Sequence, residues 1–93
     1  MPISHAEIVT ASGERLINRL CKHWSHKLEV EQNEDHARVN FDEGTCLMQA
    51  EGDKLYIAVE ALDDRSLDRL EHVVDGHLER MAANEDLDIV WQN

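Results

Sequence analysis

The segment LCKHWSHK, residues 20–27, holds the side chains of this sequence that are best suited to chemistry. It contains a thiol at Cys21 and two imidazoles at His23 and His26. Thiolates and imidazoles are common ligands of zinc and iron, and imidazoles also transfer protons in catalysis. The segment therefore suggests a metal or catalytic site, provided that the local backbone directs these three side chains to one point.

Apolar residues at helical spacing predict that this segment ends a helix that begins after Thr10 or Ser12 and continues to about residue 26. At about 100° per residue, His23 and His26 fall together on one flank of that helix, while Cys21 falls on the other flank. The three side chains are therefore not expected to form one site. The side chains that make the apolar face are Leu16, Ile17, Leu20 and Trp24.

A second helix is predicted from Asp63 or Asp64 to about residue 82, and its apolar stripe contains a histidine. Helical phase places His77 near the centre of this stripe. A buried imidazole needs a hydrogen-bonding partner, because burying an unpaired polar group costs about 1–3 kcal/mol. Gly76 is expected to let the first helix approach closely. The stripe consists of Leu67, Leu70, Val73, Val74, Leu78 and Met81.

Packing of the two helices side by side would bring His77 near His23 or His26. Three imidazoles with one open position suit zinc or iron, so these three histidines are the candidate metal ligands. The competing interpretation is structural: His77 bonds a carbonyl or hydroxyl group in the core, and the other two complement the helix dipole. The structural interpretation is favoured, because HxxH is a weak motif and no glutamate intervenes as in HExxH.

A catalytic constellation is not evident elsewhere, and no catalytic residue is predicted. The sequence has no GxSxG motif and no glycine-rich phosphate loop. Cys46 alternates with Met48 and Ala50, which favours a core position. Lysine and histidine neighbours can lower the pKa of a thiol such as Cys21, but an unreactive thiol is favoured there as well. The two cysteines form no CxxC motif and are expected to be free thiols, with a disulfide between them as the alternative. An enzyme is therefore the least favoured class.

The length and the charge of the chain limit the classes of function that remain. Ninety-three residues with 42% hydrophobic content predict a single domain, residues 1–93, with one core. Nine basic and 20 acidic residues give a formal charge of −11, which opposes binding to nucleic acid and to anionic membranes. The sequence has no signal-peptide pattern and no apolar run of about 20 residues, so a cytoplasmic location is expected.

Alternating apolar and polar residues between the two helices predict four short antiparallel strands. Turns are expected at 33–36, 42–44 and 51–53, and further strands at 3–10 and 87–91. The resulting order, β-α-β-β-β-β-α-β, predicts an α+β two-layer sandwich. In it, an antiparallel sheet carries both helices on one face.

The other face of this sheet would have no helix over it. Its polar side chains are interspersed with Leu47, Tyr56, Ala58 and Val90. Exposed apolar residues within a charged rim often mark protein contacts, so these four are the candidate contacts for a protein partner or a second copy. Ordinary scattered surface residues are the alternative. A single tyrosine in an acidic rim does not make a stacking platform for RNA.

Several segments of the sequence resemble one bacterial family. They are LCKHWSHK at 20–27, FDEGTC at 41–46, ALDDRSLDRLEHVV at 61–74 and HLERMAANEDLDIVW at 77–91. Over about residues 4 to 91 the chain is similar to the bacterial domain of unknown function 2218. The resemblance implies no established activity. It does imply a context in iron uptake, since such domains occur beside, or joined to, siderophore-interacting reductases.

Two functions of different classes follow. The first is a small acidic non-catalytic domain that acts through contacts with a protein partner or with itself, in iron or siderophore utilisation as the resemblance implies. The alternative is a metal- or small-ligand-binding protein that uses His23, His26 and His77 between its helices, with zinc or iron as the cofactor.

Overall fold

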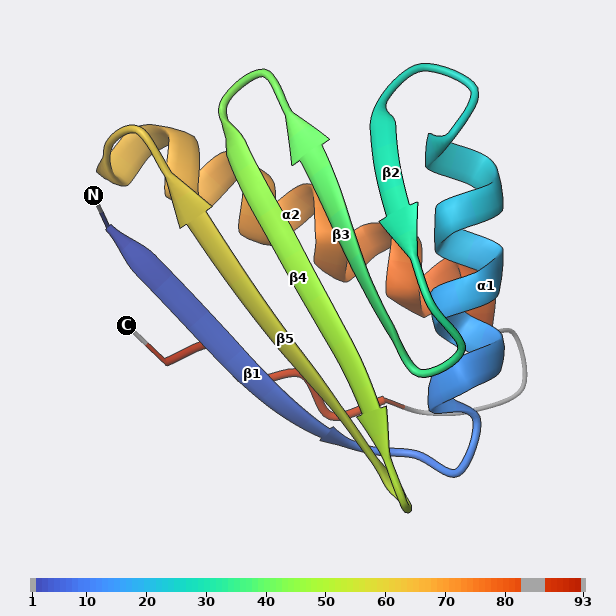
Figure 1. Cartoon of the computed structure of the whole chain (residues 1–93). Helices are drawn as coiled ribbons and strands as arrows, with labels where there is room; N and C mark the ends of the chain where they lie inside the picture. The colour runs from blue at the N-terminus through green and yellow to red at the C-terminus, as the bar shows by residue number, and fades with distance from the viewer. Residues whose placement is uncertain (1, 83–86, 93) are drawn as a thin grey trace.

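The computed structural model describes residues 2–82 and 87–92, and within them the chain forms five strands and two helices (Figure 1). The strands are β1 (Ile3–Val9), β2 (Glu29–Gln32), β3 (His36–Phe41), β4 (Gly44–Glu51) and β5 (Lys54–Ala61). The helices are α1 (Gly13–Trp24) and α2 (Asp64–Ala82).

All five strands belong to one antiparallel sheet with the order β1-β5-β4-β3-β2. The strands β2 to β5 follow one another as a meander, and β1 pairs with the free edge of β5. Both helices cover the same face of the sheet and leave the other face open (Figure 1). The predicted α+β two-layer sandwich is therefore confirmed.

Two tight hairpins fix the register of the central strands. Gly52, between β4 and β5, has a φ of 61°, a backbone conformation that glycine adopts without steric cost. Gly44 begins β4 where a side chain has no room, because a Cβ there would lie 2.8 Å from the Cα of Ala61. These short connections leave no freedom for a one-residue slip, which would turn each strand's apolar side chains to the wrong face.

The core lies between the helices and the covered face of the sheet. Each helix contributes the side chains of its predicted apolar stripe, except that Val73 of α2 is 37% exposed and lies outside the core. The strands contribute every second residue. Burial of each large aliphatic side chain stabilises the fold by about 1.5–3 kcal/mol. The largest fully buried side chains are Ile8, Leu16, Ile17, Leu20, Leu55, Ile57 and Leu78.

The starts of the two helices agree with the sequence, but α1 ends earlier than predicted. The Asp63 carboxylate accepts a hydrogen bond of 2.8 Å from the backbone N–H of Ser66 and caps α2. At the end of α1, the N–H groups of Lys27 and Leu28 both bond to the carbonyl of Trp24. His26 therefore lies in a turn after the helix, and its predicted helical phase does not apply.

Two other expectations about local structure are wrong. No strand forms at 87–91; instead, a single antiparallel bridge joins His5 to Gln92, with N···O distances of 2.9 and 2.8 Å. The predicted alternation does hold, because Leu87, Ile89 and Trp91 pack against the core while the residues between them are exposed. A Cβ placed on Gly76 would meet no atom within 4 Å, so this glycine does not mediate a close approach of the helices.

Neither described helix is long and apolar enough to cross a membrane.

Candidate functional site: a groove on the open face of the sheet

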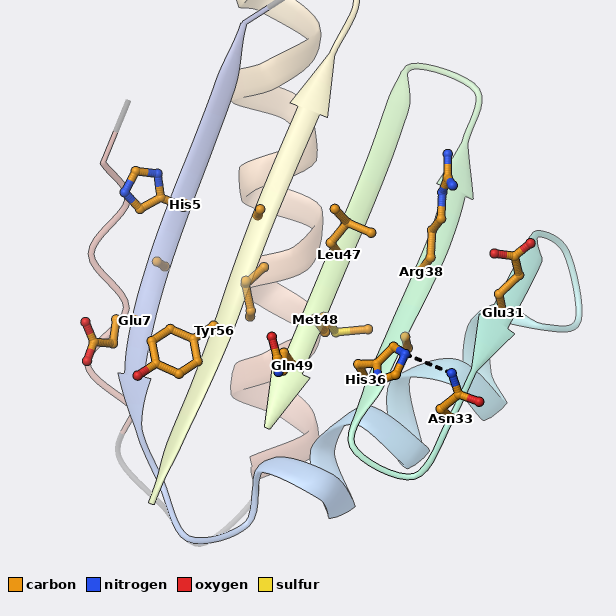
Figure 2. Close-up of a pocket in the computed structure, with 14 residues that line it drawn as sticks. His5, Glu7, Glu31, Asn33, His36, Arg38, Leu47, Met48, Gln49 and Tyr56 are labelled. Atoms are coloured by element: carbon orange, nitrogen blue, oxygen red, sulfur yellow. Dashed lines mark hydrogen bonds between the residues drawn. The ribbon is translucent and has the colours of Figure 1, made fainter. Parts of the chain in front are cut away.

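The face of the sheet opposite the helices is hollowed by a groove with a volume of about 830 Å³ (Figure 2). One row of side chains crosses it from strand to strand in register: His5, Ala58, Leu47, Arg38 and Glu31. Because the small Ala58 lies between His5 and Leu47 in this row, the sheet surface is low there. The strand order thus places a small apolar side chain between larger polar and apolar ones.

A second row lies one pleat further along the strands and contains Glu7, Tyr56, Gln49 and His36. Towards the other end of the sheet, a smaller hollow of about 270 Å³ shares Arg38, Leu47 and Ala58 with the groove. The apolar floor made by Leu47 on β4 and Ala58 on β5 is therefore common to both hollows.

Three of the four predicted partner-contact residues lie together in this groove. The side chains of Leu47 on β4 and Tyr56 on β5 are large, and these residues are 49% and 37% exposed. Ala58, also on β5, is half-buried. Val90 is also exposed, but it belongs to the C-terminal segment and does not line the groove. Their role in partner contact stays a prediction.

Charged groups surround this apolar floor. Lys54 pairs with Glu7 at 2.6 Å, and this hydrogen bond together with the glutamate charge raises the pKa of the lysine. Within residues 2–82 and 87–92, Glu31, Glu60 and Arg38 make no ion pair. The rim therefore carries two carboxylates and one guanidinium without an ion-pair partner, and the carboxylates outnumber the guanidinium.

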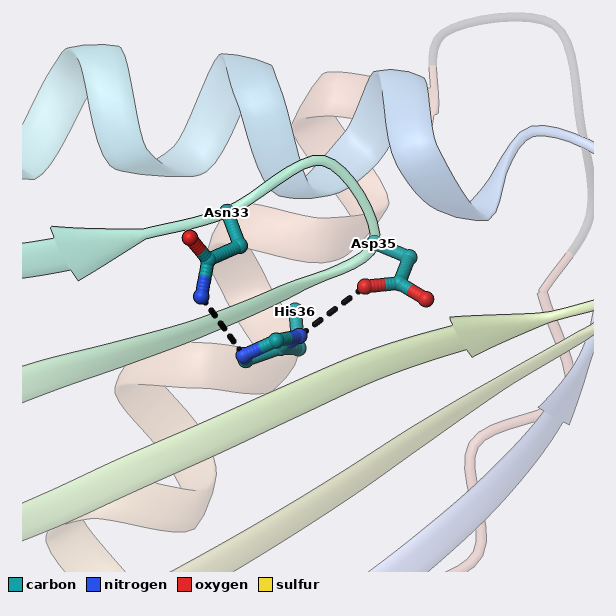
Figure 3. Close-up of polar contacts among 3 residues, drawn as sticks. All are labelled: Asn33, Asp35 and His36. Atoms are coloured by element: carbon teal, nitrogen blue, oxygen red, sulfur yellow. Dashed lines mark hydrogen bonds and ion pairs between the residues drawn. The ribbon is translucent and has the colours of Figure 1, made fainter.

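The tight turn between β2 and β3 carries a polar cluster that the sequence analysis treated only as a turn. His36 Nδ1 lies 2.9 Å from Asp35 Oδ1, and His36 Nε2 lies 2.8 Å from Asn33 Nδ2 (Figure 3). The carboxylate accepts the Nδ1–H, so Nε2 accepts from the amide of Asn33. The sequence signal for this cluster is an asparagine at 33 three residues before His36, with an aspartate directly before the histidine.

This cluster favours binding over proton transfer. A general base needs a ring nitrogen that is free to meet a substrate, whereas both nitrogens of His36 already have partners. The imidazole is instead oriented by these two contacts and forms a polar part of the rim of the groove.

The structure brings two of the three candidate metal ligands together. The rings of His23 and His77 lie 5.0 Å apart between centroids, and Trp24 lies 5.2 Å from His77 on the same helix junction. His77 is half-buried and donates Nδ1–H to the carbonyl of Val73 at 2.7 Å, as the structural interpretation predicts. His26 is exposed and makes no ring contact with the described residues. The part of the chain that the structure describes has no group of three or more His, Cys, Asp or Glu side chains that could hold a metal ion.

Cys21 is not a reactive thiol of lowered pKa, the less favoured of the two possibilities for this residue. Its side chain faces the core and not the helix flank, so burial raises the pKa of the thiol. The lysine and histidine neighbours in sequence are exposed and do not offset this effect. Cys46 is fully buried as predicted, and burial, with a smaller contribution from Cys21, raises its pKa to about 12. Both cysteines are free thiols and not activated nucleophiles.

Comparison with curated proteins finds no match. Among solved structures, the chain is similar to one titled "NMR structure of PA4090 from Pseudomonas aeruginosa", with 39% sequence identity and a TM-score of 0.84. The match covers 99% of this chain and 96% of the other. A family model described as an uncharacterised protein conserved in bacteria, DUF2218, matches residues 5–92. The chain therefore belongs to the DUF2218 family of bacterial proteins.

Proposed function

We propose that this domain is a non-catalytic binding module and that the groove on its open sheet face docks a segment of a protein partner. The observation that carries the proposal is the cluster of Leu47, Tyr56 and Ala58 on a sheet face that no helix covers. Side chains of this kind, surrounded by polar groups, form the apolar centre of many protein interfaces.

Charge selects the kind of partner. Glu31 and Glu60 are unpaired carboxylates at the rim, and the whole chain carries −11. A segment with apolar anchors and flanking lysine or arginine residues complements both the floor and the rim. A second copy of this chain would bring the same negative charge to the interface, so a basic heterologous partner is favoured over self-association.

A direct test uses synthetic peptides that combine leucine or phenylalanine with lysine. Titration into the ¹⁵N-labelled domain is expected to shift the amide signals of β3, β4 and β5. Leu47→Glu should weaken binding at least about tenfold, the range of an interface anchor. Leu62→Glu is the matched control, because Leu62 is 63% exposed and does not line the groove.

Shifts that map to another surface, or equal weakening by the two variants, would argue against the groove as the docking site. Sedimentation of the free domain tests whether a second copy of this chain occupies the groove. A concentration-dependent dimer that Leu47→Glu dissociates would identify a second copy in place of a basic partner.

The proposed biological context is iron or siderophore utilisation. What supports this context is the resemblance to domains that occur beside, or joined to, siderophore-interacting reductases. The proposed context is tested by measuring how tightly such a reductase binds the domain and its Leu47→Glu and Leu62→Glu variants. The proposed context would be contradicted if the reductase had the same affinity for the domain as an unrelated protein of similar charge.

A further inference from the structure

We infer that His23 and His77 form a two-histidine site for a divalent transition metal ion at the junction of α1 and α2, independent of the groove. The C-terminal half of α2 reaches α1 on the covered side of the sheet (Figure 1), and this contact sets the two rings 5.0 Å apart between centroids. With metal–nitrogen bonds of about 2.0–2.1 Å, two imidazoles on one ion have centroids about 4.5–5.2 Å apart for bond angles from square to tetrahedral. The observed separation lies within that interval.

The hydrogen bond of His77 prepares one of its nitrogens for a metal. Since a carbonyl oxygen can only accept, the 2.7 Å contact with Val73 requires the proton on Nδ1. In the neutral ring this leaves the lone pair on Nε2. Metal-bound histidines commonly donate their second N–H to a carbonyl or carboxylate, which fixes the tautomer and the ring orientation. The bond to Val73 thus has the form of an outer-shell contact.

The surroundings suit a partly exposed site. His23 is exposed, so water can reach the ion and complete its coordination, while Trp24 lies 5.2 Å from His77 and forms an apolar wall. Trp24 in turn packs edge-on against Phe41 at 5.2 Å. The net charge of −11 attracts divalent cations to the domain. Imidazole ligands select zinc, copper or nickel over magnesium and calcium.

The test uses untagged full-length protein in a buffer that does not bind metals, with Zn²⁺ and Cu²⁺ as the probes. Calorimetry is expected to show about one equivalent of Zn²⁺ bound. The electron paramagnetic resonance spectrum with Cu²⁺ should show hyperfine coupling to two imidazole nitrogens. His23→Ala and His77→Gln should each weaken binding by about tenfold or more, as outer-shell changes alone often do.

His72→Ala is the control, because His72 is an exposed histidine of α2 and makes no ring contact with the described part of the other helix. His72→Ala should keep the affinity of the unchanged protein, and thermal melts without metal should show that all the variants fold. Affinity that His23→Ala and His77→Gln leave unchanged would overturn the inference. Equal loss on His26→Ala would also overturn the pair, in favour of a three-histidine site.

Discussion

Leu47 on β4 lies directly opposite Ala58 on β5 in the antiparallel register, and both residues line the groove on the open face of the sheet. The leucine supplies apolar surface, and the alanine beside it leaves room for an incoming side chain. Both residues also line the smaller hollow beside the groove. A larger side chain at position 58 would therefore enter the groove and leave the core unchanged.

Ala58→Phe is expected to fill the groove and to weaken binding of the basic amphipathic peptides at least about tenfold, as blocking an anchor site does. The new ring enters open space, so the free energy of unfolding should change by less than about 0.5 kcal/mol. Calorimetric titration and urea denaturation measure the two effects. Ala58→Ser is the control of unchanged size, and a phenylalanine variant that binds as tightly as the serine variant would count against the groove.

Two glycines should respond to alanine with opposite signs. At Gly44 the added methyl group would clash with backbone atoms, the carbonyl oxygen of Glu60 and the Cα of Ala61, so Gly44→Ala should destabilise the fold. At Gly76, inside α2, nothing lies within 4 Å of the added group, and Gly76→Ala should stabilise by about 0.5–1 kcal/mol through helix propensity. Urea denaturation of both variants checks the signs; a stabilised Gly44→Ala would refute the close packing at the β3–β4 hairpin.

The pH dependence of stability should carry a contribution from a pair of carboxyl groups on α2. A hydrogen bond with Asp75, and the charge of that residue, raise the pKa of Glu79 in the folded state. The folded protein therefore holds this proton more tightly than the unfolded chain does. The resulting stabilisation is present below the unfolded-state pKa and is lost as pH rises through the raised folded value.

Glu79→Gln should consequently reduce the loss of stability that accompanies a rise from pH 4 to pH 7. Thermal melts across this range measure the effect, and Glu34→Gln on the β2–β3 hairpin removes one negative charge without touching α2. If the two variants show the same pH profile, the repulsion between the Glu79 and Asp75 carboxyl groups does not contribute to stability.

Both thiols should be inert in the native state. Burial raises the pKa of Cys21 and Cys46, the latter to about 12, so little thiolate exists at neutral pH and reagents cannot reach the sulfur atoms. A disulfide-exchange reagent is expected to label neither thiol during an hour at pH 8 and both at once in denaturant. Fast labelling of Cys21 alone would show that α1 opens from the core.

Much of the fold was predictable because its causes are local. Apolar residues repeat at 3.6 positions in the two helices and at two positions in the strands, and each period selects one backbone conformation. The cap at Asp63 and the turn at Gly52 likewise depend on a few adjacent residues. Even the C-terminal segment kept its predicted alternation, although only one bridge to β1 formed.

The arrangement of the candidate sites was not predictable from the sequence, because it depends on contacts between residues far apart in the chain. Alternation puts Leu47 and Ala58 on one face, but only the pairing of β1 with β5 adds His5 to the same row. The orientation of Cys21 was decided by how α1 packs on the sheet. The separation of His23 and His77 was set by the junction of two helices.

The sequence by itself therefore determined the two helices, the five strands of the sheet and the two faces of the sheet, since local periodicity and turn chemistry are sufficient for these. Only the tertiary structure decided which side chains share a groove and which histidines meet. Strand order and helix packing are set by the total burial of apolar surface, a sum over distant residues that no short segment contains.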